Sequence, residues 1–536
     1  MTFHFRFVFF ALALVHCLVS THGILDPQLN GESPYKNVVQ LLSSHPAGYS
    51  EMSSASIPIM AMLKGGTLDF IPRIRDLFME IVHRNPNIEA VVSLHQKPLQ
   101  LRGLDNTHEQ SDLRWTYQQL KQGVSHLSSQ LDALGVMKGS AITFFCENRA
   151  EWVLLCWTSI LLGCPFVPLN PRLACNGEEL RHVLDQISPS VIIVVGQETG
   201  SYLQHNASDQ LEKAQLLVSL EEVENGTTKF KWLSLASLWS CTPFSESTWA
   251  GPVFEDTTII GFTSGTTSFP KACPQSSANL MTSAIAIRDL REIGPTDRLC
   301  QHLPSFAAMA VLISLTCGIC GATIVYPSPS FSATATLDAI EQERCTYTFA
   351  APAIVKALAM HPTISQRSLD SLRIVELGGA PIYSDILQLA TSKQGLNCER
   401  VGCGWGMTES PAPLLAQTWK RSMPLPMDYI AVGKPIRGTF AKLCLPNSHE
   451  PITNGQEGEL HVGGPQVIRG YLNGDNKPFY EEAGIRWIRT GDMARFEDGQ
   501  VYIIGRYKDI IIRGGLNISP AKIERVLENI FDAEVS

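Results

Sequence analysis

The chain has 536 residues, more than one ordinary domain, so we expect at least two hydrophobic cores. Hydrophobic residues make up 44% and charged residues 17%, which indicates a globular protein and excludes a largely disordered one. The net charge of −9 argues against a nucleic-acid partner, which would need a basic face. Many of the fourteen cysteines lie in apolar runs, as Cys156, Cys317 and Cys320 do, which predicts buried, reduced thiols.

The first 23 residues have the pattern of a signal peptide or signal anchor. Residues 1–6 carry one positive charge, residues 7–19 are apolar apart from His16, and small or polar residues follow. The apolar run is too short for an ordinary membrane span. Residues 24–70 are rich in Ser, Pro and Gly and predict a poorly defined extension.

From residue 71 onward the sequence predicts a large α/β domain. Helical periodicity begins with Ile74, Leu77, Phe78 and Ile81. Between residues 140 and 200, strand-like runs alternate with helical ones, which is the pattern of βαβ units and a parallel sheet. The expected strands there are 141–146, 166–169 and 191–195, and the expected helices are 151–162 and 178–187.

The same alternation returns between residues 251 and 390 and predicts a second helix-covered sheet. The strands expected there are 257–262, 322–326, 347–350 and 372–377, with a helix near 278–292. Residues 430–505 are richer in Gly and β-formers, with strands expected at 459–462 and 501–504, which predicts a smaller β-rich lobe.

The loop GFTSGTTSFPKAC at residues 261–273 is the most informative segment. Its hydroxyls can donate to phosphate oxygens, Gly265 allows close backbone approach, and Lys271 adds a compact positive charge. A strand, this loop and then a helix would be a phosphate-binding layout. The spacing fits neither GxxxxGK[ST] nor GxGxxG, and an ordinary Ser/Thr-rich surface loop is the alternative.

Further motifs give the loop its context, and together they resemble the acyl-adenylate-forming superfamily, above all its acyl-CoA synthetases. The loop is similar to that family's TSGTTGxPKG signature. In order along the chain the other matches are WTYQQL at 115–120, GGAP at 378–381, GWGMTE at 404–409, VGKP at 432–435, GEL at 458–460, RTGD at 489–492 and GRYKD at 505–509. The resemblance covers roughly residues 72–530.

The resemblance implies a domain order. Residues 71–505 would form the AMP-binding large domain, with two helix-covered sheets plus the β-rich lobe, and residues 506–536 a truncated small C-terminal α+β domain with a helix at 519–528. The family's late lysine, which contacts the carboxylate and α-phosphate during adenylation, has no matching segment up to Ser536. We therefore expect weak adenylation but measurable thioester formation from a supplied acyl-adenylate.

The resemblance also implies roles for individual residues. Lys271, Thr408 and Glu409 would be catalytic, with Glu409 as the Mg²⁺ ligand, and a helix cap is the alternative for Thr408 and Glu409. Lys508 would be the hinge, with a solvated charge as the alternative, and Gly514 and Gly515 would line the thiol channel. The ATP-binding residues would be Thr263, Ser264, Gly265, Thr266, Thr267, Gly379, Ala380, Pro381, Trp405, Asp492 and Arg506, with Asp492 and Arg506 at the ribose and Trp405 at the adenine.

Four positions depart from the family pattern. Ser268 and Ala272 replace glycines of the signature, Trp405 stands where tyrosine is usual, and Ala307 stands where histidine is common. The small, apolar residues 307–321 suit a pocket for a hydrophobic acid, although a core helix explains them better.

We therefore expect an acyl- or aryl-CoA ligase that uses ATP, Mg²⁺ and coenzyme A on a small carboxylic acid. A stand-alone enzyme that loads a carrier protein and a degenerate nucleotide-binding protein are the alternatives. Residues 1–23 predict an endoplasmic-reticulum or secretory location, with membrane contact only through that segment. A cytoplasmic location is the alternative, because an ATP-using ligase would more naturally face the cytosol. Sequons occur at Asn206, Asn225 and Asn517.

Overall fold

The computed structural model describes residues 60–67, 70–99, 101, 104, 111–221, 229–239, 251–263, 269–426, 430–509, 511–513, 516–518 and 520. All of them lie in the unit Pro58–Ser536. The expected helix at 519–528 falls almost wholly outside these residues, as do residues 1–57.

A seven-stranded sheet combines the strands between residues 142 and 234 with the strands at 257–262 and 272–276. The strand at 257–262 was expected in the second sheet, and that assignment is wrong. In spatial order its strands are β10 (Ala272–Ser276), β9 (Thr257–Phe262), β5 (Phe166–Leu169), β4 (Ile142–Phe145), β6 (Val191–Val194), β7 (Leu216–Ser219) and β8 (Leu233–Ser234). All neighbours are parallel except β10, which runs antiparallel to β9 at the edge. The predicted parallel sheet is confirmed.

A nine-stranded sheet combines the strands between residues 298 and 435 with two strands between residues 89 and 116. Its spatial order is β17 (Lys434–Pro435), β16 (Ser410–Lys420), β15 (Arg400–Met407), β14 (Ile374–Leu377), β13 (Tyr347–Ala350), β11 (Arg298–Cys300), β12 (Thr323–Tyr326), β2 (Glu89–Ser93) and β3 (Leu113–Thr116). The central strands, from β15 to β2, are parallel to one another. The outer strands β16, β17 and β3 are antiparallel to their neighbours.

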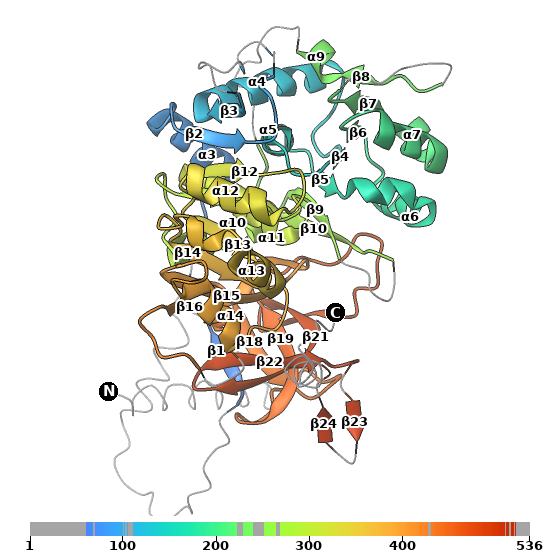
Figure 1. Ribbon diagram of the computed structural model, residues 1–536. Coiled ribbons are helices and arrows are strands. Elements are labelled where there is room, and N and C mark those ends of the chain that lie inside the picture. The colour runs from blue at the N-terminus through green and yellow to red at the C-terminus, as the bar shows by residue number, and fades with distance from the viewer. Residues whose placement is uncertain are drawn as a thin grey trace, which may run out of the picture. The chain divides into compact units, whose positions relative to one another are not determined.

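Helices cover both faces of both sheets (Figure 1). They are α3 (Ile74–Arg84), α4 (Tyr117–Ala133), α5 (Ala150–Leu162), α6 (Gly177–Ile187), α7 (Gln197–Asn206), α8 (Ser208–Lys213), α9 (Leu235–Leu238), α10 (Ser277–Arg291), α11 (Ala308–Cys320), α12 (Ala333–Gln342), α13 (Pro352–Ala359) and α14 (Ser384–Thr391), with short 3₁₀ turns at Pro171–Cys175 and Ile364–Gln366.

The side-chain alternation of the strands explains this layering. In β6, Val191 and Ile193 face one core, while Ile192 and Val194 face another. The first core contains helices α3, α4, α5, α10 and α11 and lies between the two sheets. The second contains α6, α7 and α8, and a third contains α12, α13 and α14 on the other face of the nine-stranded sheet. The result is two sheets sharing one central helical layer.

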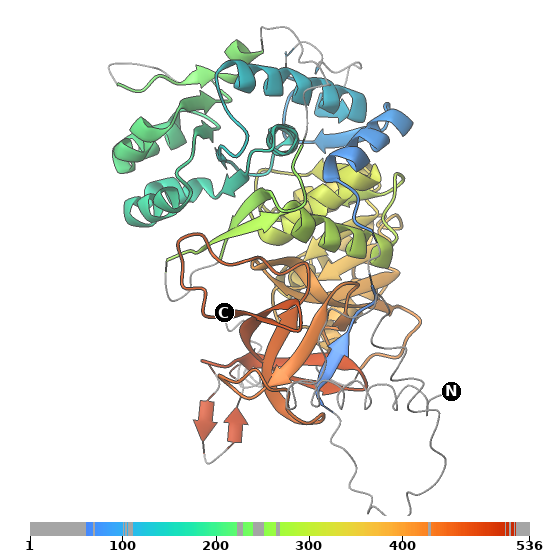
Figure 2. The ribbon, with the colours of Figure 1, turned by 180° about the vertical axis from the view of Figure 1, so that it is seen from behind.

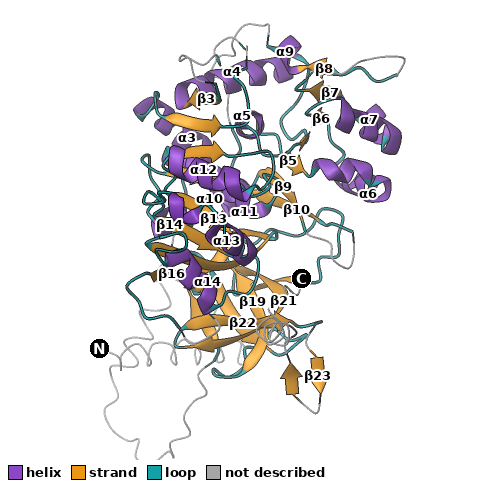
Figure 3. Cartoon of the chain, viewed as in Figure 1, coloured by secondary structure: helices purple, strands orange, loops and turns teal. Residues whose placement is uncertain are grey.

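The β-rich lobe is a six-stranded sheet, shown as the strand cluster below the nine-stranded sheet in Figure 3. Its strands are β1 (Met62–Lys64), β18 (Phe440–Cys444), β19 (Glu457–Gly463), β21 (Ile485–Glu497), β20 (Phe479–Glu482) and β22 (Gln500–Arg506), which pairs with β21. A two-stranded hairpin, β23 (Ile511–Arg513) with β24 (Leu516–Ile518), follows. Strand β1 falls inside the stretch where we expected an extension, and it pairs antiparallel with β18 (blue beside orange in Figure 2).

Residues 307–321, which could have formed either an acid pocket or a core helix, contain helix α11. From Ala310 to Cys320 every residue of this helix is buried, and it ends at Gly321, whose φ is +82°. It is therefore a core helix. The described cysteines are all free, and all but Cys175 are buried, including Cys317 and Cys320 one turn apart on α11. Within the described part of the chain, no helix combines the length and apolarity that a membrane span requires.

Candidate active site

The Ser/Thr-rich loop connects two strands. Thr263 and Lys271 close its base: the Thr263 backbone N–H donates to the Lys271 carbonyl (3.1 Å), and the Lys271 N–H donates to Thr263 Oγ1 (3.0 Å). The candidate residues Ser264, Gly265, Thr266 and Thr267 lie outside the described residues, as does Ser268.

The expected order of strand, loop and helix is wrong in one respect. Strand β10 returns antiparallel to β9 before α10 begins at Ser277. The sequence ACPQS did not predict a strand, because Pro274 lacks the N–H that a central strand needs. However, β10 lies at the edge of the sheet, where a proline is tolerated. Ser276 then caps α10 in a capping box with Asn279, and the helix spans Ser277–Arg291, close to the expected 278–292.

Lys271 and Glu409 meet at Tyr471. The Lys271 ammonium lies 4.8 Å from the centre of the Tyr471 ring, and the Tyr471 hydroxyl donates to Glu409 Oε1 at 2.6 Å. Glu409 and Tyr471 are buried and Lys271 is half-buried. A cation and a carboxylate predicted from separate motifs are thus brought to one place.

Thr408 and Glu409 form the tight connection between β15 and β16. A helix cap is therefore excluded for both residues, because they lie between two strands. The Thr408 carbonyl accepts a hydrogen bond from Gln275 Nε2 on β10 (2.9 Å). A Cβ atom on Gly261 of β9 would lie 3.2 Å from Thr408 Cγ2, so the missing side chain lets this connection pack closely on the hairpin.

Asp492, Trp405 and Arg506 form a second cluster. Trp405 Nε1 donates to Asp492 Oδ2 (2.9 Å), and Arg506 Nε forms an ion pair with Asp492 Oδ1 (2.9 Å). Burial raises the pKa of Asp492 from 3.8 to about 6, although Arg506 and the Trp405 hydrogen bond lower it and Glu409 raises it. Burial outweighs the ion pair because the Arg506 side chain is 62% exposed and its charge is screened by water.

The remaining candidate positions are exposed or lie outside the described residues. Gly379, Ala380 and Pro381 are exposed just beyond the end of β14, and Gly379 has a φ of +81°, which favours glycine. Lys508 is exposed in the turn after β22, as expected for either a hinge or a solvated charge. Gly514 and Gly515, between β23 and β24, are outside the described residues.

Two contributing residues were missed from the sequence. One is Tyr471. The other is Gln186 at the end of α6, whose side chain donates to the Pro270 carbonyl and accepts from the Ala272 N–H, both at 3.0 Å. These bonds flank Lys271 on either side and fix its backbone. Neither residue belongs to a matched motif, and each acts across a long sequence separation, so no local signal points to it.

The chemistry of the site suits magnesium. Among the described residues there is no group of three or more His, Cys, Asp or Glu side chains placed to hold a metal ion. Mg²⁺ commonly takes only one or two protein carboxylates and completes its shell with phosphate oxygens and water. A single buried carboxylate, Glu409, beside a lysine fits that mode of binding.

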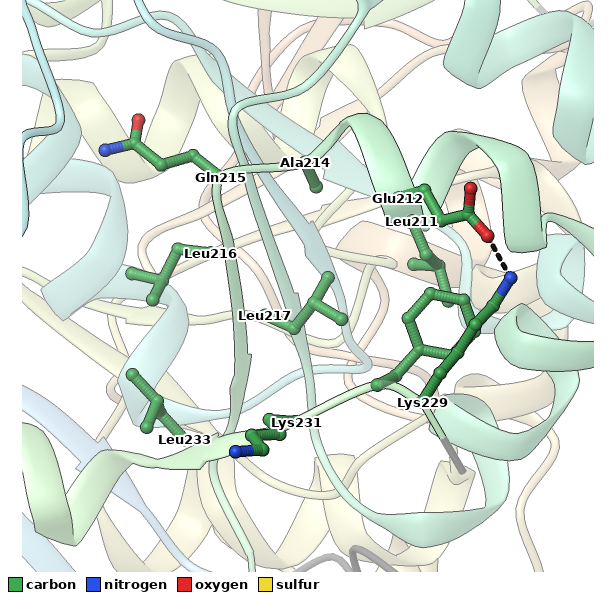
Figure 4. Close-up of a pocket in the computed structure, with 10 residues that line it drawn as sticks. Leu211, Glu212, Ala214, Gln215, Leu216, Leu217, Lys229, Lys231 and Leu233 are labelled. Carbon is green, nitrogen blue, oxygen red and sulfur yellow. Dashed lines mark hydrogen bonds and ion pairs between the residues drawn. The ribbon is translucent and has the colours of Figure 1, made fainter. Parts of the chain in front are cut away.

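Two cavities lie away from these groups. One of about 440 Å³ borders β7 and β8 and is shown in Figure 4, with Lys229 and Glu212 paired at its edge. Another of about 900 Å³ lies at the ends of β4, β5 and β6. Neither is lined by a candidate site residue.

Residues 59–472 match the family described as AMP-binding enzyme. The chain belongs to this family. It is 30% identical to an acyl-CoA ligase of Ajellomyces capsulatus over 77% of this chain and 72% of that protein. It is also 30% identical to a feruloyl-CoA synthase of an Amycolatopsis species, over 77% of each.

Solved structures support the fold assignment. O-succinylbenzoate coenzyme A synthetase from Bacillus subtilis, in complex with AMP, has a TM-score of 0.67 at 23% identity, over 84% of this chain and 83% of that one. ATP-bound MatB from Rhodopseudomonas palustris has a TM-score of 0.69 at 21% identity, over 85% and 83%. The two helix-covered sheets and the β-rich lobe are therefore the architecture of known adenylate-forming structures, as predicted.

Proposed function

We propose that this AMP-binding enzyme is an acid–thiol ligase. It would join a carboxylic acid to ATP, releasing pyrophosphate and forming an acyl-adenylate, and then transfer the acyl group to coenzyme A with release of AMP. The proposal rests on one observation: Lys271 and Glu409 both contact Tyr471. Glu409 belongs to the same motif as Trp405, whose indole N–H donates to Asp492. The named relatives, an acyl-CoA ligase and a feruloyl-CoA synthase, support the same reaction class.

The first half-reaction requires charge neutralisation and alignment. The acid's carboxylate attacks the α-phosphorus while pyrophosphate leaves, so two anions must be held together. Lys271 would place a positive charge on the phosphates, and Thr263 a hydroxyl donor, at the rigid base of the hairpin loop. Glu409 would hold Mg²⁺, which supplies further positive charge to the phosphate oxygens when it is bound.

Asp492 and its partners would hold the nucleoside. Each carboxylate oxygen can accept two hydrogen bonds, so Asp492 retains acceptor capacity for the ribose hydroxyls beside its bonds to Trp405 and Arg506. The carboxylate must be ionised to accept two donors well, and its raised pKa places that ionisation near neutrality. The Trp405 indole, held by its N–H, would offer a fixed face for adenine.

The thiol half-reaction would use the C-terminal part of the chain. Lys508 would be the hinge, and the glycines Gly514 and Gly515 would allow pantetheine to approach closely. The acid would be a hydrophobic acyl or aryl acid, in line with relatives named for ferulate and indoleacetate. Residues 1–23 would direct the protein to the endoplasmic reticulum and would be its contact with the membrane.

The test measures each half-reaction separately. ATP–pyrophosphate exchange is followed with a panel of arylpropenoic, arylacetic and aliphatic acids, and thioester formation is then measured with coenzyme A and with a phosphopantetheinyl carrier protein. Exchange with one class of acid, and thioester only with coenzyme A, is the expected result. Thioester only on the carrier would replace coenzyme A by a carrier protein, and ATP binding without exchange on any acid would contradict the ligase.

A further inference from the structure

Tyr471 touches both charged groups of the proposed phosphate and metal site. Its hydroxyl donates to Glu409 Oε1 at 2.6 Å, and its ring centre lies 4.8 Å from the Lys271 ammonium. Lys271 comes from the seven-stranded sheet and Glu409 from the nine-stranded sheet. One side chain thus bridges residues that two different sheets supply.

The segment around Tyr471 is itself fixed to both sheets. The Leu472 N–H donates to the Ala272 carbonyl at 3.0 Å, and the Ile468 N–H donates to the Glu409 carbonyl at 2.9 Å. The Tyr471 N–H donates to Asn476 Oδ1 at 2.7 Å. The backbone of this segment therefore binds the residue after Lys271 and Glu409 itself, which leaves Tyr471 little freedom to move.

The Tyr471 ring is also held by packing. It forms an edge contact with Phe479, with centroids 5.2 Å apart and an interplanar angle of 73°, and clusters with Cys273 and Ile468. Its exposed fraction is 9%, so its position is set by the protein rather than by solvent. A ring held in this way can fix the position of a flexible lysine, which otherwise retains much rotamer freedom.

We propose that Tyr471 is a positioning residue that aligns Lys271 with Glu409 for MgATP, an inference that rests on the proposed ligase function. The two contacts act separately. The hydroxyl orients the Glu409 carboxylate toward the metal, and the ring holds the Lys271 ammonium near the phosphates. Removing the hydroxyl should affect only binding that depends on Mg²⁺. Removing the ring should weaken binding of ATP with or without the metal.

The experiment compares Tyr471→Phe and Tyr471→Leu in the full chain. Calorimetry measures the affinity for ATP with Mg²⁺ and, separately, in EDTA, so the readout does not depend on turnover. Tyr471→Phe should lower the MgATP affinity about tenfold, the order expected for one hydrogen bond to a charged group, and leave the affinity in EDTA unchanged. Tyr471→Leu should lower the affinity for ATP both with Mg²⁺ and in EDTA, because the Lys271 ammonium then loses the aromatic ring that holds its position.

Two further variants sharpen the result. Tyr480→Phe removes a comparable tyrosine hydroxyl contact, 2.7 Å from His461 Nδ1 in the six-stranded sheet, and should change neither affinity. In a Glu409→Gln background, Tyr471→Phe should cost little more in MgATP affinity, because the carboxylate it orients is already gone.

The outcomes separate the two hypotheses. A wild-type chain that binds no ATP under either condition overturns both the ligase function and the role of Tyr471. A wild-type chain that binds MgATP, with Tyr471→Phe equally affected with and without Mg²⁺ or not affected at all, overturns only the role of Tyr471. Should Tyr471→Leu fail to fold, Tyr471→Phe still decides, because it keeps the ring and its packing.

Discussion

Replacing Asp492 by asparagine should stabilise the protein at neutral pH while weakening ATP binding. Asp492 is 4% exposed, and burial raises its pKa from 3.8 to about 6. Burying the ionised carboxylate therefore lowers the free energy of unfolding. The hydrogen bond from Trp405 and the ion pair with Arg506 offset part of this loss. An asparagine keeps an acceptor for Trp405 and has no charge to bury.

The magnitude follows from the pKa difference. A rise of about 2 units at 1.36 kcal/mol per unit gives about 3 kcal/mol as the cost of the charge. The folded pKa lies above the unfolded one, so the native state binds more protons between about pH 4 and pH 6, and the free energy of unfolding falls as pH rises through that window. This pKa of about 6 is the net result of burial and of the opposing Arg506 ion pair and Trp405 hydrogen bond, so the cost already includes both partners. Asp492→Asn should therefore gain up to about 3 kcal/mol of unfolding free energy above pH 6.

The assay is the unfolding midpoint of both proteins as a function of pH. The difference, Asp492→Asn minus wild type, should be positive at pH 8 and should shrink toward zero near pH 4, where both proteins are uncharged at this position. Calorimetry at pH 8 should show weaker MgATP binding by the variant. A difference that is the same at pH 8 and pH 4, or a variant that is less stable at pH 8, would refute the assignment of this cost to the buried charge.

Three other outcomes are expected. Lys271→Ala should lose about 2–5 kcal/mol of ATP binding free energy by calorimetry, and wild-type affinity would remove this residue from the site. Gln186→Leu leaves the Ala272 N–H without its partner, a loss of about 1–3 kcal/mol, and should raise the KM for ATP with unchanged circular dichroism; an unaltered KM would speak against it. If the protein enters the endoplasmic reticulum as proposed, glycosidase treatment should shift its mobility on a gel. The shift should disappear in Asn225→Gln but not in Asn206→Gln, because the Asn206 amide already donates to a backbone carbonyl at 2.8 Å. Absence of any shift in the wild-type protein would contradict that location.

Much of the fold could be predicted because buried parallel strands have little choice of residue. The strands expected at 166–169, 257–262 and 347–350 have those bounds in the structure. A strand covered by helices on both faces must be apolar at nearly every position, and short apolar runs between helical repeats reveal it. Strand β10 escapes this reasoning because it is an edge strand that contains a proline.

Candidate site residues could be chosen from the sequence, whereas the contacts between them could not. Lys271, Glu409 and Asp492 each lie in a short motif that resembles a family motif. Tyr471 and Gln186 have no such local pattern, since their partners are 62 and 86 residues away in the chain. Which side chains meet across such separations depends on how the sheets pack, and a single sequence does not contain that information in readable form.

The division of the site among sheets gives the contacts of Tyr471 their importance. Lys271 stands at the edge of the seven-stranded sheet, Glu409 follows a strand of the nine-stranded sheet, and Asp492 lies in the six-stranded sheet. Rigidity within one sheet cannot fix the distance between groups on different sheets. Side-chain bridges must do so, and Trp405 to Asp492 and Tyr471 to Glu409 are two of them. Residues that join sheets at this site should therefore affect ATP binding even where they do not touch ATP itself.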